Sequence, residues 1–401
     1  MNIALINSEH PQTNGAHGGI ASLNYTLANA FAKCGHRVHL LLREGTVPDT
    51  LCSSIQIQYY EFKPSSSPIK HLDRLFRNGA MVWERGHSRH LREILLQIDR
   101  DEKLDTALIP DYGGMAHQMH APLPFTVVTI FCMPSQMVDQ INQVAITATR
   151  RKQYLFEAKA ITRASGYVCF MPSIIPWLSK RYSPLRAEIT TIKTPVDTTI
   201  LENPKPLRDT ENRNLLFAGR LEHRKGAGII LESIKKILEC DSRIQMTFAG
   251  QTDCGGNCNY QKEIERILTP EENQRVTFCG HLKRDLLYSL YKESYALIVP
   301  SLFDNCPNTL LEAMAAGLAI IGSDATGIAD FITHEENGLL FPLSSPLKIV
   351  DHIKRIVSDE ALACRLGKNA FTYVKEQHSP DSIVGDYTKL FQSINTRSRK
   401  N

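Results

Sequence analysis

The sequence has 401 residues, of which 42% are hydrophobic and 22% charged, with a formal net charge of +4 at pH 7. That length is too great for one hydrophobic core and suits two domains of roughly 150–200 residues each, while the composition is that of an ordered globular protein. Lys and Arg are interspersed with Asp and Glu, which argues against a dedicated nucleic-acid-binding protein and leaves a small anionic ligand open.

The N-terminus and the cysteines bear on the compartment in which the protein works. Residues 1–7 lack the charged start and apolar run of a signal peptide, and no stretch of about 18 uninterrupted apolar residues occurs. We therefore expect a cytoplasmic protein whose ten cysteines are reduced thiols. Cys254 and Cys258 have a suggestive spacing, but no second ligand pair follows, so we interpret them as part of an ordinary loop and expect no metal.

The first half of the chain has the pattern of alternating buried strands and helices. A strand over residues 3–6, a glycine-bearing loop, a helix and a strand over 38–42 together make a βαβ unit. The same pattern favours an open parallel sheet. It predicts further strands at 55–60, 106–109, 125–130, 166–170 and 189–192, and helices at 80–98 and 149–164.

In the second half the alternation restarts after a lapse between Asp197 and Asn214, where prolines and charges accumulate as in an interdomain linker. We expect an α/β protein with two doubly wound, Rossmann-like domains facing a central cleft, where open α/β sheets bind ligands. Strands are predicted at 215–218, 245–249, 276–279, 295–299 and 319–321, and helices at 227–238, 261–268, 284–293 and 309–316. The predicted boundaries are an N-terminal domain over 1–197, a linker over 198–213, a C-terminal domain over 214–380, and a segment over 381–401 whose helix at 384–394 crosses back to the N-terminal domain.

The loop after the first strand of the second half carries two cations, Arg220 and Lys225, at the start of a predicted helix. A helix N-terminus attracts phosphate through its free N–H groups, and an Arg fork and a Lys point charge would add to that attraction. A solvated basic loop is the alternative, and the local sequence alone favours it.

Two carboxylates stand eight positions apart in residues 300–317, Asp304 in a loop and Glu312 in the first turn of a predicted helix. Glu312 could accept hydrogen bonds from a ribose diol while Asp304 faces sugar hydroxyls. Thr309 and Glu312 also fit a capping box with Thr309 as the N-cap, and the local sequence does not separate the two interpretations.

Residues 215–342 resemble the donor-binding domain of the retaining family 4 glycosyltransferases of GT-B fold. The N-terminal half matches the family in fewer places: Gly18-Gly19, Gly35-His36-Arg37-Val38, a helix containing Glu157, Ser173 after a strand, and Pro195-Val196-Asp197. The motifs that carry the resemblance are Gly-Arg…Lys-Gly at 219–226, Phe-Ala-Gly at 248–250, Val-Thr-Phe-Cys-Gly at 276–280, the Pro-Ser loop with its paired acids, the Glu-Ala-Met-Ala-Ala-Gly helix at 312–317 and Asn-Gly-Leu-Leu-Phe at 337–341.

The resemblance implies that Arg220 and Lys225 neutralise the donor diphosphate as the sugar bond breaks, and that Asp304 orients the sugar, which makes these three the implied catalytic residues. It also implies that Glu312 holds the ribose and that residues after Gly280 line the base. In such enzymes the anomeric configuration is retained, the leaving phosphate helps to deprotonate the acceptor, and neither a metal nor another cofactor is required. The implied donor-binding residues are Gly18, Gly19, Arg220, Lys225, Leu282, Asp304, Asn305, Cys306, Asn308, Thr309, Leu310 and Glu312.

Two positions depart from the family pattern. Asp304 stands where Glu is usual, which leaves the identity of the donor sugar open, and Phe131 stands where many members have a His near the reacting sugar. His117 and His120 are candidates for that role, although we favour solvated loop histidines for both. For Glu157 we likewise favour a surface carboxylate over an active-site group.

The sequence therefore predicts an enzyme that transfers a hexose or N-acetylhexosamine from a nucleotide diphosphate sugar, with UDP favoured over GDP. The acceptor would be a hydroxyl of a glycan, a lipid-linked intermediate or a small natural product. The alternatives are a nucleotide-sugar-binding protein without turnover, or an epimerase or phosphorylase on the same architecture. Basic stretches at 71–92 and 150–152 leave peripheral contact with the inner face of a membrane open, although we favour a solvated helix face.

Overall fold

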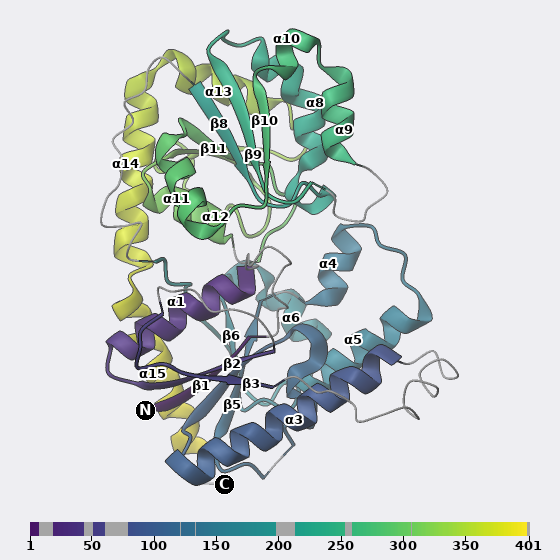
Figure 1. Ribbon diagram of the computed structural model, residues 1–401, viewed down its shortest axis with the longest axis vertical. Coiled ribbons are helices and arrows are strands. Elements are labelled where there is room, and N and C mark those ends of the chain that lie inside the picture. Colours follow the sequence, from purple (N-terminus) through teal and green to yellow (C-terminus); the bar gives the residue numbers. More distant parts are fainter. Residues whose placement is uncertain are drawn as a thin grey trace. The chain divides into compact units, whose positions relative to one another are not determined.

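The computed structural model describes residues 1–7, 19–43, 51–60, 79–120, 122–132, 134–197, 213–252, 259–305 and 307–398. The chain forms two compact units, Met1–Pro195 together with Pro380–Asn401, and Val196–Ser379. Each unit is built on its own parallel sheet (Figure 1).

The first unit has a seven-stranded sheet in the order β3-β2-β1-β4-β5-β6-β7. The chain order reverses between β1 and β4, which makes the sheet doubly wound with a switch point at these two strands. Every residue of β1 is buried, as expected of a parallel strand that helices cover on both faces. The strands are β1 Asn2–Asn7, β2 Arg37–Leu42, β3 Gln56–Tyr59, β4 Thr106–Pro110, β5 Thr126–Phe131, β6 Gly166–Cys169 and β7 Ile189–Thr191.

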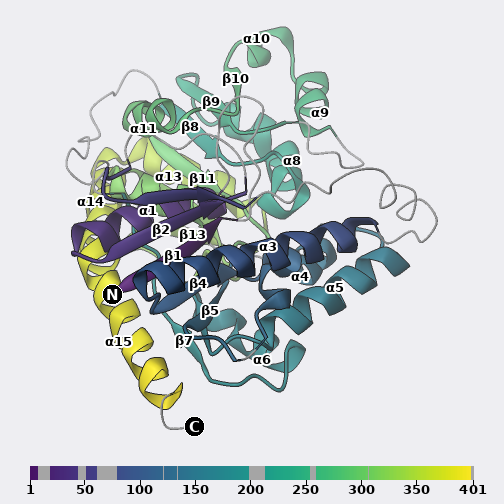
Figure 2. The ribbon, with the colours of Figure 1, turned by 60° about the horizontal axis from the view of Figure 1, so that its bottom comes forward.

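The helices of the first unit come from two separate parts of the chain. They are α1 Gly19–Lys33, α3 Gly79–Glu102, η1 Tyr112–Gln118, α4 Ser135–Ile141, α5 Ala148–Ile161, η2 Pro172–Ile174, α6 Ile175–Arg181 and α15 Pro380–Ser398. Helix α15, at the end of the chain, contacts α1 and β5 (Figure 2). The ring of Phe31 lies 5.6 Å from that of Tyr387 and 6.2 Å from that of Phe391. At Gly166 an added Cβ would lie 2.3 Å from Cδ1 of Ile394, so glycine allows α15 to pack closely on β6.

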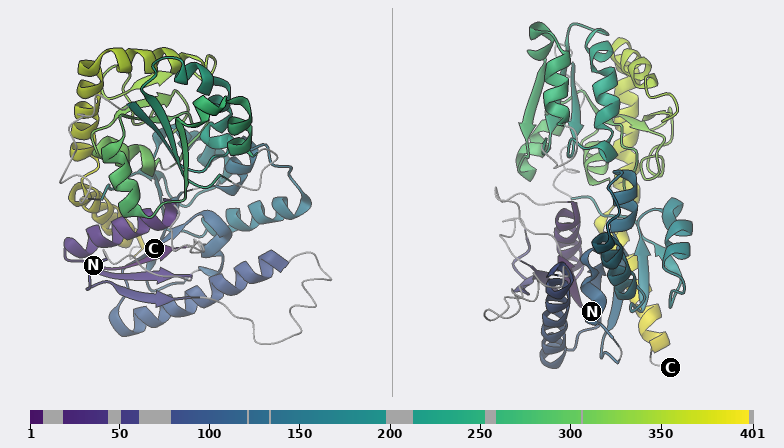
Figure 3. Two further views of the ribbon diagram at one scale, coloured as in Figure 1. Left: turned by 45° about the horizontal axis from the view of Figure 1, so that its top comes forward. Right: turned by 90° about the vertical axis from the view of Figure 1, so that its right-hand side faces the viewer.

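The second unit has a six-stranded parallel sheet in the order β10-β9-β8-β11-β12-β13, with helices packed against it (Figure 3). The order again reverses, here between β8 and β11, so the loops after these two strands lie at a switch point. The strands are β8 Arg213–Ala218, β9 Ile244–Ala249, β10 Val276–Gly280, β11 Ala296–Val299, β12 Ala319–Ser323 and β13 Leu339–Phe341. The helices are η3 His223–Lys225, α8 Ala227–Leu238, α9 Tyr260–Ile267, α10 Pro270–Asn273, α11 Arg284–Glu293, α12 Asn308–Ala315, α13 Lys348–Ser358 and α14 Glu360–Gln377.

Every strand and helix predicted from the sequence has a counterpart within a few residues, but three details differ. Arg213, placed in the predicted linker, is already the first residue of β8, and the other linker residues, 198–212, lie outside the described residues. Helix α12 begins at Asn308 with Pro307 as its N-cap, so the interpretation of Thr309 as the N-cap of a capping box is wrong. Strand β13 and helices α4, α6, α10, α13 and α14 were not predicted.

Candidate functional site

The loop that follows β8 carries Arg220 and Lys225 and packs against the loop that follows β11. Gly226 has a φ of +78° and is the N-cap of α8. A Cβ on this glycine would lie 1.9 Å from the carbonyl oxygen of Pro300. Only glycine therefore permits both the left-handed conformation and the close approach of the two loops.

The two loops are joined by buried charges. The Lys225 ammonium donates a hydrogen bond to Oδ2 of Asp304, and Nη1 of Arg224 lies 3.8 Å from Oδ1 of the same carboxylate. Arg224 is fully buried and donates from Nη2 to Glu222 at 2.7 Å and from Nη1 to the carbonyl of Phe303 at 3.2 Å. Burial lowers the pKa of Lys225, whereas Asp304 raises it.

Arg220 extends this network to the surface. Its Nη2 lies 3.3 Å from Glu222, and its side chain is 45% exposed, against 16% for Lys225 and 2% for Arg224. We call the alternating set of Arg220, Glu222, Arg224, Asp304 and Lys225 the charge ladder. Arg220 and Lys225 are the two cations of the charge ladder that a ligand can reach.

Glu312 lies buried in α12 and faces helix α11. It accepts a hydrogen bond from the hydroxyl of Tyr291 at 3.1 Å. Burial raises the pKa of Glu312, and the positive charge of Arg284 and the Tyr291 hydroxyl oppose that rise. Arg284 also forms an ion pair with Asp197 at 3.3 Å and stacks over the ring of Tyr288. The sequence interpretation missed these partners, although the spacing of 284, 288 and 291 would have placed them on one face of a predicted helix.

The other predicted donor residues fall into three groups. Leu282, Asn308 and Thr309 are partly exposed in the second unit, whereas Asn305 and Leu310 are buried. Gly18 and Cys306 lie outside the described residues, as do Cys254 and Cys258. Gly19 is the exposed first residue of α1 in the first unit.

In the first unit the expectation for Glu157 is wrong, because this carboxyl group is 2% exposed. It accepts hydrogen bonds from Oγ of Ser135 at 2.7 Å and from the backbone N–H of Gly113 at 3.2 Å. Burial raises the pKa of Glu157 to about 7, and the charge of Asp111 adds to the rise. Glu157 therefore ties together the segments that follow β4 and β5.

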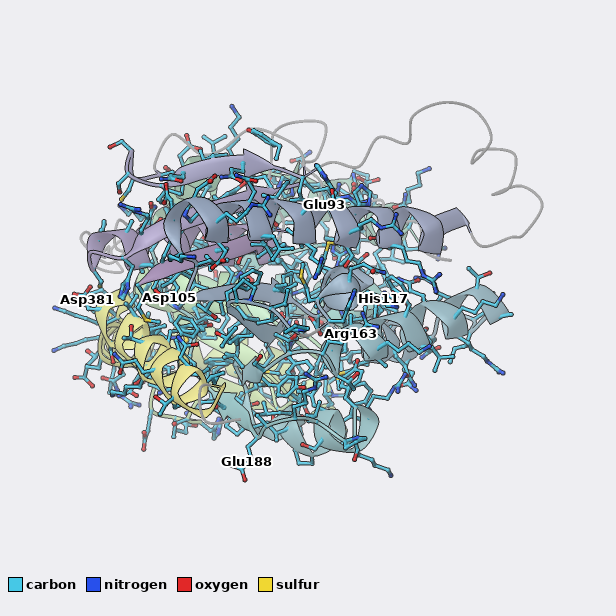
Figure 4. All side chains as sticks on the ribbon, turned by 90° about the horizontal axis from the view of Figure 1, so that it is seen from below. Glu93, Asp105, His117, Arg163, Glu188 and Asp381 are labelled. Atoms are coloured by element: carbon cyan, nitrogen blue, oxygen red, sulfur yellow. The ribbon has the colours of Figure 1, made fainter. Side chains whose placement is uncertain are left out.

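The two histidines differ. His117 is buried and stacks on Phe156 with ring centroids 4.0 Å apart, so its interpretation as a solvated loop histidine is wrong, whereas His120 is exposed as expected. Burial and then the charge of Arg163 lower the pKa of His117 to about 4, and Figure 4 shows these two side chains near each other. Phe131 is a buried core residue of β5, stacked on Tyr182.

The described part of the chain has no group of three or more His, Cys, Asp or Glu side chains arranged to hold a metal ion. Within the same residues, no helix combines the length and the apolar character needed to cross a bilayer.

Comparison with known proteins assigns the segment that carries the charge ladder and Glu312. Residues 200–373 match the family described as glycosyl transferases group 1. This segment is a group 1 glycosyltransferase domain. Glycogen synthase from Mycobacterium tuberculosis is 23% identical over 378 residues, which cover 92% of this chain and 89% of that protein. A glycosyltransferase from Methanocaldococcus jannaschii is 29% identical over 182 residues, so that match spans 45% of each protein.

Solved structures extend the likeness of the group 1 glycosyltransferase domain to the whole chain at the level of the fold. Sucrose-phosphate synthase from Thermosynechococcus elongatus superposes with a TM-score of 0.75 at 20% identity and covers 99% of both chains. The Anabaena protein HepE, solved in complex with UDP and glucose, gives a TM-score of 0.72 at 14% identity and covers 98% of this chain and 99% of its own. The fold is therefore GT-B.

Proposed function

We propose that this chain is a retaining, metal-independent glycosyltransferase that moves a hexose or N-acetylhexosamine from a UDP-sugar to an acceptor hydroxyl. The observation that carries the proposal is the charge ladder, because it presents two cations in the loop that leads into α8, at the switch point of the second sheet. Arg220 and Lys225 would bind the diphosphate and stabilise the charge that develops as the sugar bond breaks. Glu312 would accept hydrogen bonds from the ribose hydroxyls, with Tyr291 fixing its orientation.

Supporting observations come from the switch point and from the relatives. The loops after β8 and β11 lie where open α/β sheets bind ligands. A structural neighbour was solved with UDP-glucose, and another, a starch synthase, with ADP. We therefore propose that the nucleotide binds in the second unit, and we favour UDP over ADP and GDP as that nucleotide.

The test is thermal unfolding with UDP, GDP, ADP and NAD in the absence of added metal, on wild type, Lys225→Ala and Glu312→Ala. A ligand at one hundred times its Kd adds about 2.7 kcal/mol to the free energy of unfolding, which raises Tm by several degrees. We expect UDP to give that rise in wild type and in Lys236→Ala, an exposed lysine of α8, and neither site variant to respond. Equal responses of wild type and both site variants to UDP would refute the donor site.

Turnover separates the proposed enzyme from its alternatives. With a UDP-sugar bound, a transferase releases UDP and the sugar appears on an acceptor, whereas an epimerase releases an isomeric UDP-sugar and a phosphorylase requires inorganic phosphate. A binding protein without turnover would leave the UDP-sugar intact. Products are identified by NMR, which also gives the anomeric configuration.

We also propose that the first unit meets the anionic cytoplasmic face of a membrane through α5. The exposed residues Arg151, Lys152, Leu155 and Lys159 recur at three- and four-residue spacing along one side of this helix, and Leu155 is 60% exposed. Between residues 142 and 163 the sequence has one carboxylate, Glu157, and it is buried. A basic face with an apolar centre suits an anionic lipid surface.

Vesicle sedimentation tests the membrane proposal. The protein is expected to bind vesicles that contain phosphatidylglycerol and to stay in solution with phosphatidylcholine alone. Binding should fall in both Arg151→Glu/Lys152→Glu and Leu155→Ser. Loss in the charge variant with full binding by Leu155→Ser would instead indicate a soluble polyanion as the partner, and no binding in wild type would refute the proposal.

A further inference from the structure

Asp304 of the charge ladder lies between two cations, the buried Arg224 and the partly buried Lys225. Its Oδ2 accepts a hydrogen bond from Lys225, while its Oδ1 is 3.8 Å from Nη1 of Arg224, inside ion-pair range but beyond hydrogen-bond distance. The Asp304 side chain is nearly fully buried, as is that of Arg224. A buried carboxylate is costly unless a cation stays close to it.

The backbone holds Asp304 and Arg224 in register. The N–H of Leu302 donates to the carbonyl of Arg224 at 2.8 Å, and the N–H of Asp304 donates to the carbonyl of Thr326 at 3.2 Å. The absence of a Cβ at Gly226 lets the two loops approach closely at Pro300. A change of partner at Asp304 would therefore require side-chain rotation alone, and Lys225, with four rotatable bonds in its stem, is the more adaptable of the two cations.

A diphosphate bound at Lys225 would carry at least two negative charges next to the Asp304 carboxylate. The like charges repel, and the diphosphate competes with Asp304 for the same ammonium. Arg224 is the nearby cation that could accept the displaced carboxylate, since one of its nitrogens already faces Oδ1.

We propose that Arg224 takes over the Asp304 carboxylate when a diphosphate binds Lys225, so that Arg224 and Asp304 act as positioning residues for the phosphate-binding lysine. The inference rests on the proposed function and adds two residues to it. It also changes the expected role of Asp304, since the family resemblance gives this carboxylate a contact with the sugar. A residue that contacts only the sugar to be transferred should not affect the binding of UDP, which lacks that sugar.

The experiment measures the Kd of UDP by calorimetry at pH 6.5 for wild type, Arg224→Gln, Asp304→Asn and the double variant. We expect Arg224→Gln to weaken UDP binding roughly tenfold or more, as for a lost charge-assisted hydrogen bond, because Asp304 then stays on Lys225. Asp304→Asn should bind UDP several-fold more tightly than wild type, because no carboxylate competes. In the double variant the effect of Arg224→Gln should disappear, which gives a large coupling between the two positions.

Equal weakening by Arg224→Gln with and without the Asp304 charge would overturn the proposal, because Arg224 would then act on the phosphate directly or on the fold. Repeating the cycle with Glu222→Gln removes the contribution of the other Arg224 partner. Arg243→Gln, which removes an exposed Arg–Asp pair in the same unit, is the control and should leave the Kd unchanged. Should Arg224→Gln fail to fold, Asp304→Asn alone decides, since unchanged or weaker UDP binding contradicts the exchange.

A second measurement is the pH dependence of UDP binding. It responds to the exchange of the Asp304 carboxylate from Lys225 to Arg224, and not to a structural role of these residues. The charged groups that face Lys225 are Asp304, Arg224 and Glu222, and Asp304 raises the pKa of the lysine. The UDP affinity of Asp304→Asn should therefore decline at a lower pH than that of wild type. Failure of wild type to bind UDP, GDP or ADP would refute the donor site together with the exchange, whereas binding without coupling would refute the exchange alone.

Discussion

Replacing Glu157 with glutamine is expected to change how the stability of the first unit depends on pH. Glutamine keeps the shape of the side chain and an oxygen that can accept from Ser135 and Gly113, but it has no proton to lose. Burial holds the pKa of Glu157 at about 7, against 4.5 for an ordinary glutamate. Between pH 4.5 and about pH 7, Glu157 therefore keeps its proton in the folded state and has released it in the unfolded chain.

The sign follows from proton binding. Because the folded state binds more protons in this window, the free energy of unfolding falls as pH rises from 4.5 to about 7, and it levels off above. At 1.36 kcal/mol for each pKa unit the full loss is about 3 kcal/mol, of which about 2.5 kcal/mol falls between pH 5 and pH 8. Glu157→Gln should escape that loss.

Urea unfolding followed by tryptophan fluorescence at pH 5 and pH 8 measures the effect. Both tryptophans, Trp83 and Trp177, belong to the first unit, so the fluorescence reports on that unit. His117, with its pKa lowered to about 4, titrates in an overlapping pH range and changes the stability in the opposite direction. The quantity to compare is therefore the pH-dependent change in the free energy of unfolding of the variant minus that of wild type. Glu188→Gln, at an exposed glutamate of the same unit, is the control. If Glu157→Gln loses as much stability as wild type between the two pH values, the reasoning fails.

The remaining predictions concern the second unit. Gly226→Ala should lower its free energy of unfolding by about 2–4 kcal/mol, seen by circular dichroism, because the new Cβ meets the Pro300 carbonyl in a strained backbone; stability equal to wild type would contradict the close approach. Tyr291→Phe should weaken UDP binding about tenfold by calorimetry through loss of the hydrogen bond to buried Glu312, and an unchanged Kd would place the ribose elsewhere. EDTA should leave the rate of UDP release unchanged, and a loss of rate that Mg²⁺ restores would refute metal independence.

The alternation of strands and helices was predictable because parallel strands are buried on both faces and stand out as short apolar runs. Strand β1 and strand β8 are of this kind. Strand β13 was not predicted, and its pairing with β12 comes from tertiary contacts.

In the site, the sequence predicted Arg220, Lys225 and Asp304 of the charge ladder and missed Glu222 and Arg224. Arg224 looks like one more solvated cation in a basic loop, and what buries it is a carboxylate 80 positions further along the chain. Glu157 and His117 were misjudged for a similar reason. Burial of a polar side chain depends on partners such as Ser135 and Phe156, which arrive from other segments, and local sequence does not contain that information.

The position of α15 has a consequence for synthesis. Phe31 in α1 and Gly166 in β6 find their partners in a helix that leaves the ribosome after the whole second unit. The nascent N-terminal segment must therefore wait with part of its apolar surface exposed while residues 196–379 are made. The second unit is continuous in the chain and can fold first, so the order of maturation runs opposite to the order of translation.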